Sequence, residues 1–201
     1  EELGEEKVTN MTIMTENFEA VDIAMEFPFM VVATQNPVEH EGTYRLPEAQ
    51  LDRFMFKILV DYPRKEEEIE VLELHDKRSS ESWKEQTPVV SVGELSYLRE
   101  KVHDVHVDGK IKAFIVDIVG TTRDNAWLYL GASPRASIAL MNSAKAFAAI
   151  SGRDFVVPED VLYLAAPVLR HRVQLSAEKE LEGVVVDQVI QQLIAKVEIP
   201  R

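Results

Sequence analysis

A run of five consecutive apolar residues, Phe29–Ala33, places the tightest restriction on the fold of this chain. Thr34, Gln35, Asn36 and Pro37 follow at once and end the run. An apolar stretch of this length without alternation is typical of a parallel strand buried on both faces. The run therefore predicts a central strand of an α/β sheet.

The neighbouring segments fit the same α/β interpretation. Alternating apolar residues over Arg53–Val60 predict a second strand, and Pro63 precedes an acidic helix over Lys65–Lys77. Residues 1–26 have no clear period, although 21–25 alternate as a half-buried strand does, so we expect a hairpin or a loop there. Residues 1–77 thus predict part of an α/β domain.

The pattern changes to a helical one after residues 78–90, which have no period and predict a linker. Ser91 and Glu94 form the sequence of a capping box, and Asp108 can cap a second helix. A third helix is predicted from Ser133–Pro134 to a stop at Gly152. Pro158 predicts the start of a fourth helix, and Asp187 the cap of a fifth. Residues 91–201 are therefore predicted to form a small all-α domain.

Composition narrows the classes of protein. The chain has 201 residues, no cysteine and a formal net charge of −13, and residues 1–70 hold 17 acidic against 6 basic residues. Nucleic acid is a poor partner for such a surface, which also disfavours a DNA-translocating motor. Without cysteine or an apolar run of membrane length, we expect a cytoplasmic protein with no membrane partner. The chain begins at Glu1 without methionine, so we expect a fragment.

Two arginines and one asparagine are candidates for phosphate chemistry. Asn36 follows the predicted buried strand, where an amide can orient a water molecule, although it could equally be a turn residue. Arg53 precedes the second strand, where a guanidinium could act as an arginine finger or simply pair with Asp52 or Glu48. No metal site is predicted.

Arg135 has the stronger physical argument. It lies in the first turn of the helix that Ser133–Pro134 begins, where the helix dipole repels a cation unless an anion also binds. Ser133 and Arg135 are therefore predicted to bind a phosphate group, the alternative being that Arg135 pairs with an acidic residue of a neighbouring helix. The basic run Arg170–Arg172 could hold one phosphate or an acidic partner.

The 201 residues contain no GxxxxGK[ST] phosphate loop and no apolar strand ending in Asp-Glu. The chain alone is therefore not expected to hold Mg-ATP in the manner of a P-loop protein, and we expect it to be inactive by itself.

Several ordered motifs resemble the MoxR family of AAA+ ATPases. They are Ala33–Pro37, Glu41–Tyr44, Leu46–Phe54, Tyr62–Pro63, Gly131–Ala136, Gly152–Asp154 and Val168–Arg172. The resemblance implies the second part of an AAA+ core, a P-loop NTPase type of parallel sheet, over residues 1–77. It implies a linker over 78–90 and the helical lid over 91–201.

The resemblance also assigns roles. Asn36 matches sensor 1, Arg53 the arginine finger offered to the next subunit, and Arg135 the sensor 2 arginine, acting on its own or a neighbouring subunit. It implies ATP and Mg²⁺, with the Mg²⁺ ligands outside these residues, and a ring, expected to be a hexamer, that remodels protein clients such as von Willebrand factor A domain proteins. The alternative is a non-catalytic helical module for protein interaction.

Overall fold

The computed structural model describes residues 9–14, 20–25, 28–35, 47–77 and 87–200. The chain divides into two compact units. The first comprises Glu1–Tyr44 and Pro88–Glu100, and the second Arg45–Thr87 and Lys101–Arg201. The domain boundaries at residues 77 and 91 stay a prediction.

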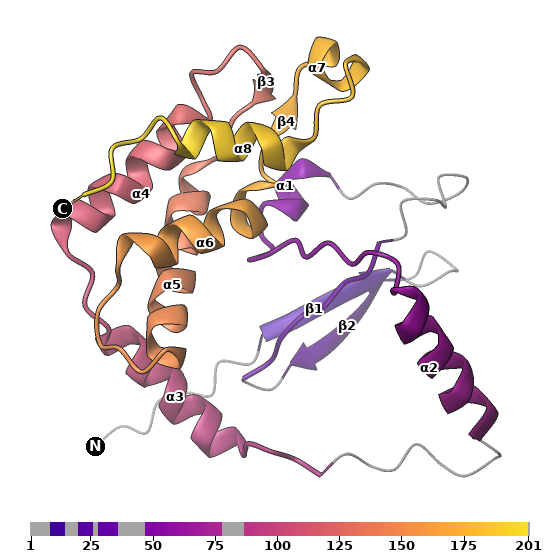
Figure 1. Cartoon of the computed structure of the whole chain (residues 1–201). Coiled ribbons are helices and arrows are strands. Elements are labelled where there is room, and N and C mark those ends of the chain that lie inside the picture. The colour runs from indigo at the N-terminus through magenta and orange to yellow at the C-terminus, as the bar shows by residue number, and fades with distance from the viewer. Residues whose placement is uncertain (1–8, 15–19, 26–27, 36–46, 78–86, 201) are drawn as a thin grey trace. The chain divides into compact units, whose positions relative to one another are not determined.

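The first unit contains a two-stranded antiparallel hairpin (Figure 1). Its strands are β1 (Thr9–Met14) and β2 (Ala20–Met25), and the register pairs Thr9 with Met25 and Met14 with Ala20. The hairpin predicted within residues 1–26 is thereby confirmed.

Helix α3 (Val92–Asp104) contributes residues to both units and begins with the predicted capping box. The Ser91 hydroxyl accepts from the Glu94 amide over 3.2 Å, and the Glu94 carboxylate accepts from the Ser91 amide over 2.8 Å. These reciprocal bonds satisfy two amides that a helix start otherwise leaves free.

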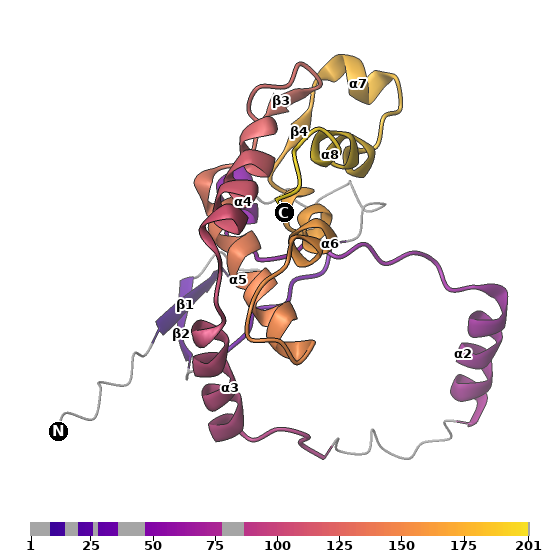
Figure 2. The ribbon, with the colours of Figure 1, turned by 60° about the vertical axis from the view of Figure 1, so that its left-hand side comes forward.

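The second unit holds a helical bundle, by which we mean α4, α5, α6 and α8 (Figures 1 and 2). Their bounds are Gly109–Thr121, Pro134–Ile150, Pro158–Leu169 and Val186–Ile194. The Asp108 carboxylate accepts from the Lys110 amide, so its predicted cap is confirmed. Gly152, at φ 74°, lies just past the end of α5, as predicted.

Apolar stripes at helical spacing form the core of the bundle. Helix α4 buries Ile111, Phe114, Ile115, Ile118 and Val119, as its sequence period predicts. Helix α5 buries mainly small residues against α6, which lets the two helices approach closely; they are Ala136, Ala139, Leu140, Ser143, Ala144 and Ala148. The prediction that Asp187 caps the last helix is wrong, because Val185 is the N-cap of α8 and the Asp187 side chain pairs with Arg170.

Short elements complete the second unit. Helices α1 (Glu48–Leu51) and α2 (Lys65–Lys77) agree with the sequence. Strand β3 (Leu128–Leu130) pairs antiparallel with β4 (Gln174–Leu175), and α7 (Ala177–Leu181) follows. None of these last three elements was predicted. In the part of the chain that the structure describes, no helix has both the length and the apolar character that a membrane crossing requires.

The two predicted strands of a parallel sheet do not form. Residues 29–33 and 56–60 adopt neither strand nor helix, and their side chains are exposed. A parallel strand needs a neighbouring strand to take up its backbone hydrogen bonds. Among the described residues none lies beside either segment, and the Lys57 amide instead donates to the Pro167 carbonyl of α6 over 3.0 Å.

Candidate functional site

The start of α5 is fixed by its own cap. Ser133, with extended φ −73° and ψ 166°, is the N-cap residue, and its hydroxyl accepts from the Arg135 amide over 3.2 Å. Pro134 occupies the first helical position, where its missing N–H leaves no bond unmade. The backbone of Arg135 is therefore held within the first turn of a 17-residue helix.

A close approach between two chain segments positions that helix start. A Cβ atom added to Gly131 would lie 2.6 Å from the Thr122 carbonyl oxygen and 2.7 Å from the Arg123 Cα. The Thr122 hydroxyl accepts from the Ala132 amide over 2.9 Å. Gly131 thus lets the segment before Ser133 lie directly on the end of α4.

Asp52, the C-cap residue of α1, links this helix start to Arg172. One carboxylate oxygen, Oδ2, accepts from the Ser133 hydroxyl over 2.9 Å. The other, Oδ1, accepts from Arg172 Nε over 3.0 Å. Arg135 Nη1 also lies 3.9 Å from Oδ2, with the Arg135 side chain 59% exposed. Such a long and solvated pair contributes little, so Arg135 stays available to an anion.

Arg53 follows Asp52 directly and is exposed. Among the residues that the structure describes, its guanidinium forms neither the ion pair with Asp52 nor the one with Glu48 that were its alternatives. Asp52 pairs with Arg172, and the Glu48 carboxylate accepts from the Gln174 side chain. The charge of Arg53 is therefore presented to solvent.

Arg172 uses all five of its N–H donors. Nε donates to the Asp52 carboxylate, Nη2 to the Asp52 and Phe54 carbonyls, and Nη1 to the Met55 and Val168 carbonyls. Its side chain is 2% exposed. Burial lowers the pKa of this guanidinium, and the Asp52 charge opposes that shift. A fully bonded, paired charge can remain ionised in such a place.

The backbone carbonyls at the C-terminal end of α6 also have hydrogen-bond donors. A helix leaves its last four carbonyls without helical partners, and here Ala166–Leu169 all accept hydrogen bonds. Their donors are the Arg170 amide, the Lys57 amide, and the side chain and amide of Arg172. The Asp52–Lys57 segment supplies one of these donors, the Lys57 amide, and Arg172, which also bonds to that segment, supplies two.

Arg170 and His171 hold the same segment. Arg170 donates to the Lys57 carbonyl over 3.1 Å and forms a bidentate pair with Asp187 at 3.1 and 2.8 Å. His171 Nε2 donates to the Phe54 carbonyl over 2.9 Å, while its buried Nδ1 has no partner among the described residues. The basic run, for which a phosphate and an acidic partner were the two alternatives, thus pairs with acidic residues of the same chain, Asp52 and Asp187.

The His171 ring is held neutral by its surroundings. Burial is the main cause that lowers the pKa of this imidazole, and the Arg172 and Lys57 charges lower it further. The bond to the Phe54 carbonyl and the Asp52 charge act in the opposite direction.

The predicted site residues fall into two groups. Arg53, Ser133 and Arg135 lie around Asp52, whereas Asn36 lies outside the described residues. Their catalytic and binding roles stay predictions. Sequence reasoning named Asp52 only as a possible partner of Arg53, and Arg172 only as part of the basic run; it did not predict that the two pair with each other.

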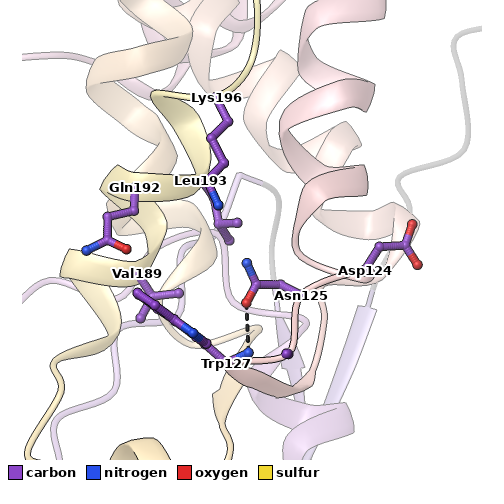
Figure 3. A pocket seen from close by; sticks show the side chains of 8 residues that line it. Asp124, Asn125, Trp127, Val189, Gln192, Leu193 and Lys196 are labelled. Carbon is purple, nitrogen blue, oxygen red and sulfur yellow. Dashed lines mark hydrogen bonds between the residues drawn. The ribbon is translucent and has the colours of Figure 1, made fainter.

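The site is distinct from the pocket in Figure 3. That pocket, of about 260 Å³, lies between the Asp124–Trp127 loop and α8, and the Asn125 side chain accepts from the Trp127 amide within it. It contains none of the predicted site residues. Among the described residues, no cluster of three or more His, Asp or Glu could hold a metal ion.

Comparison with known proteins identifies the family. Residues 120–193 match the AAA lid domain, and residues 5–56 match the ATPase family associated with various cellular activities (AAA). Chaperone MoxR1 of Mycobacterium tuberculosis is 38% identical over 186 residues, covering 88% of this chain and 48% of that protein. Protein MoxR of Paracoccus denitrificans is 29% identical over 180 residues, covering 77% of this chain and 51% of its own length.

The chain belongs to the MoxR family of AAA+ ATPases. A further relative, the uncharacterized protein YeaC of Bacillus subtilis, is 45% identical over 173 residues, covering 86% of this chain and 53% of its own. The crystal structure of a candidate ATPase from Cytophaga hutchinsonii superposes with a TM-score of 0.80 at 37% identity, covering 94% of this chain and 59% of that one.

The MoxR-family assignment confirms the predicted fold class, part of an AAA+ core followed by a helical lid. The chain spans about half the length of the curated relatives it matches.

Proposed function

We propose that the complete protein containing these 201 residues hydrolyses ATP and uses the energy to remodel protein partners. The observation that carries this proposal is the exposed Arg53, which has no bonding partner among the described residues and sits on a segment held to the bundle by Arg172. A guanidinium presented in this way can stabilise the charge that develops as a γ-phosphate is cleaved.

Arg53, Arg135 and Asn36 have different roles in the proposed transfer of the phosphoryl group to water. Arg53 acts as the arginine finger on the nucleotide of a neighbouring subunit. Arg135 and the start of α5 bind phosphate, because a solvent-exposed cation and a helix N-terminus both attract anions. Asn36, as the sequence suggests, orients the attacking water.

ATP would supply the reacting phosphate and Mg²⁺ would neutralise its charge when bound. The start of α5 fits a phosphate group, since its first turn carries Arg135 and no acidic residue. The phosphate loop and the Mg²⁺ ligands belong to residues outside this sequence, and we propose that these 201 residues alone are inactive.

We propose the assembly and the partners from the family resemblance. A finger that acts on a neighbouring nucleotide requires a second subunit, and we propose that the subunits form a hexameric ring in the cytoplasm. The name of the mycobacterial relative, a chaperone, supports remodelling of protein clients. We place von Willebrand factor A domain proteins among these clients.

The test is the ATPase rate of the complete protein with Arg53→Ala. The rate should fall by about a thousandfold, the lower range for loss of an arginine finger. Arg64→Ala is the matched control, because Arg64 is also exposed and, within the described part of the chain, pairs with Glu67 at the start of α2. If the rate with Arg53→Ala stays equal to that of the control, the finger assignment is wrong.

The assembly has its own measurement. Native mass determination with ATP should give six subunits for the wild type and for Arg53→Ala. A monomer under ATP would remove the ring from the proposal.

A further inference from the structure

One nitrogen atom of Arg172 bonds to the backbone on both sides of Arg53. Arg172 Nη2 donates to the carbonyl of Asp52 over 3.1 Å and to the carbonyl of Phe54 over 2.5 Å. These are the residues on either side of Arg53. A single buried guanidinium group therefore holds the peptide unit just before Arg53 and the one just after Phe54.

Arg172 donates most of its hydrogen bonds to the turn that carries Arg53, which is part of the Asp52–Lys57 segment. Four of its five acceptors lie on the Asp52–Lys57 segment. They are Oδ1 and the backbone carbonyl of Asp52 and the carbonyls of Phe54 and Met55. The fifth is the Val168 carbonyl at the end of α6. Because a planar fork binds only in one orientation, these bonds set the position and the direction of the turn.

The same turn is connected to Arg135. Asp52 Oδ2 accepts from the Ser133 hydroxyl over 2.9 Å, and that hydroxyl accepts from the Arg135 amide over 3.2 Å. Two hydrogen bonds thus separate the Arg53 turn from the backbone of Arg135. The Asp52 carboxylate is the counter-ion of Arg172 and the anchor of Ser133 at once.

We propose that Arg172, with Asp52 as its counter-ion, is a positioning residue that holds Arg53 in a fixed placement relative to the start of α5. The inference rests on the proposed function, since it names what sets the geometry of the same site. Arg172 touches no reacting atom and acts through Arg53. Catalytic groups misplaced by about 1 Å can lose roughly a hundredfold in rate, so the placement matters.

The experiment is a double-mutant cycle on the complete protein, with Arg53→Ala, Arg172→Lys and the double variant. Arg172→Lys keeps the charge and removes the fork. We expect kcat to fall about 10- to 100-fold with KM for ATP within about twofold, because substrate contacts are unchanged. Adding Arg172→Lys to Arg53→Ala should then lower kcat by less than about twofold, since residues that act as a unit are not additive.

Arg153→Lys is the matched control. Arg153 forms a bidentate pair with the buried Asp160 at 2.8 and 2.6 Å. It lies past the C-terminal end of α5, whereas Asp52 bonds to the start of that helix, so the loss of Arg153 tests stability alone. Amide hydrogen exchange should speed up over residues 52–57 in Arg172→Lys and not in Arg153→Lys. If Arg172→Lys does not fold, Asp52→Asn replaces it in the cycle, because an amide keeps the bond from Arg172 Nε without the charge.

The outcomes separate the two proposals. A normal kcat for Arg172→Lys, or a defect that multiplies with that of Arg53→Ala, overturns the positioning role and leaves the finger intact. An unchanged kcat for Arg53→Ala overturns the arginine-finger assignment of the proposed function instead, whatever the exchange at residues 52–57 shows. Non-additive kcat with locally faster exchange supports positioning.

Discussion

Arg172 and Asp52 are 120 positions apart in sequence, yet Nε of one donates to the carboxylate of the other over 3.0 Å. Arg172 is 2% exposed and Asp52 18%, so the pair is largely removed from water. Taking one partner away leaves a buried charge, which costs more than the pair itself contributes.

Asp52→Ala should therefore lower the free energy of unfolding by about 3 kcal/mol, since it leaves Arg172 buried without a counter-charge. Asp52→Asn should cost about 1 kcal/mol, because the amide still accepts from Arg172 Nε. Urea unfolding measures both. Asp117→Ala, at an exposed position on α4, is the control and should change the free energy of unfolding by less than about 0.5 kcal/mol. Equal effects of Asp52→Ala and Asp117→Ala would contradict the buried pair.

Ser133→Ala removes the cap of α5 and should lower stability by about 1 to 2 kcal/mol, read from the same unfolding curves. Ser176→Ala is its matched control. Ser176 is also an N-cap residue, of α7, but its side chain makes no capping hydrogen bond. Ser176→Ala should lower the free energy of unfolding by less than about 0.5 kcal/mol. If Ser176→Ala lowered it more than Ser133→Ala does, the capping role of Ser133 would be refuted.

Gly131→Ala should destabilise by about 2 kcal/mol, because its new Cβ would overlap the backbone of Thr122 and Arg123. Gly120→Ala tests the reverse case within α4. A Cβ there meets no atom within 4 Å, so alanine should stabilise by up to about 1 kcal/mol through its higher helix propensity. Thermal midpoints of the two variants should move in opposite directions, and a shift of Gly131→Ala upward would exclude the close approach.

Acid should weaken the protein through His171. The pKa of this ring is lowered in the folded state, mainly by burial, so the unfolded chain binds the proton more readily. The resulting stability is complete above the ordinary value of 6.5 and is lost as pH falls from there through the lowered folded pKa. The urea midpoint should thus decrease between pH 7.5 and 5.5.

His171→Gln removes that component while its amide can still donate to the Phe54 carbonyl. Its urea midpoint should depend less on pH than that of the wild type. His103→Gln, at an exposed position, should retain the wild-type dependence. The same pH profile in His171→Gln and wild type would show that another group is responsible.

Local signals were sufficient to predict most helices. Caps at Ser91, Asp108 and Ser133 are contained in a few neighbouring residues, so the sequence around each predicts where a helix begins. Strands β3 and β4, of three and two residues, are too short to have a period. They depend on a pairing between distant segments.

The failure at Phe29–Ala33 has a related cause. Five apolar residues predict burial, but a parallel strand exists only beside another strand, and the described residues do not provide one. At the site, the Ser133 cap and the exposure of Arg135 agree with local reasoning. The bond between Asp52 and Arg172 joins residues 120 positions apart, and the residues next to each in sequence do not predict this pairing.

The order of synthesis adds a consequence to that separation. A ribosome that adds about 5 to 20 residues per second completes Arg172 roughly 6 to 24 seconds after Asp52. Until α6 has emerged and folded, the turn that carries Arg53 lacks the donors that hold it. A nascent or truncated chain that ends before Arg172 therefore lacks the bonds that hold the segment around Arg53. The residue that completes these contacts is made after α6 and before α8.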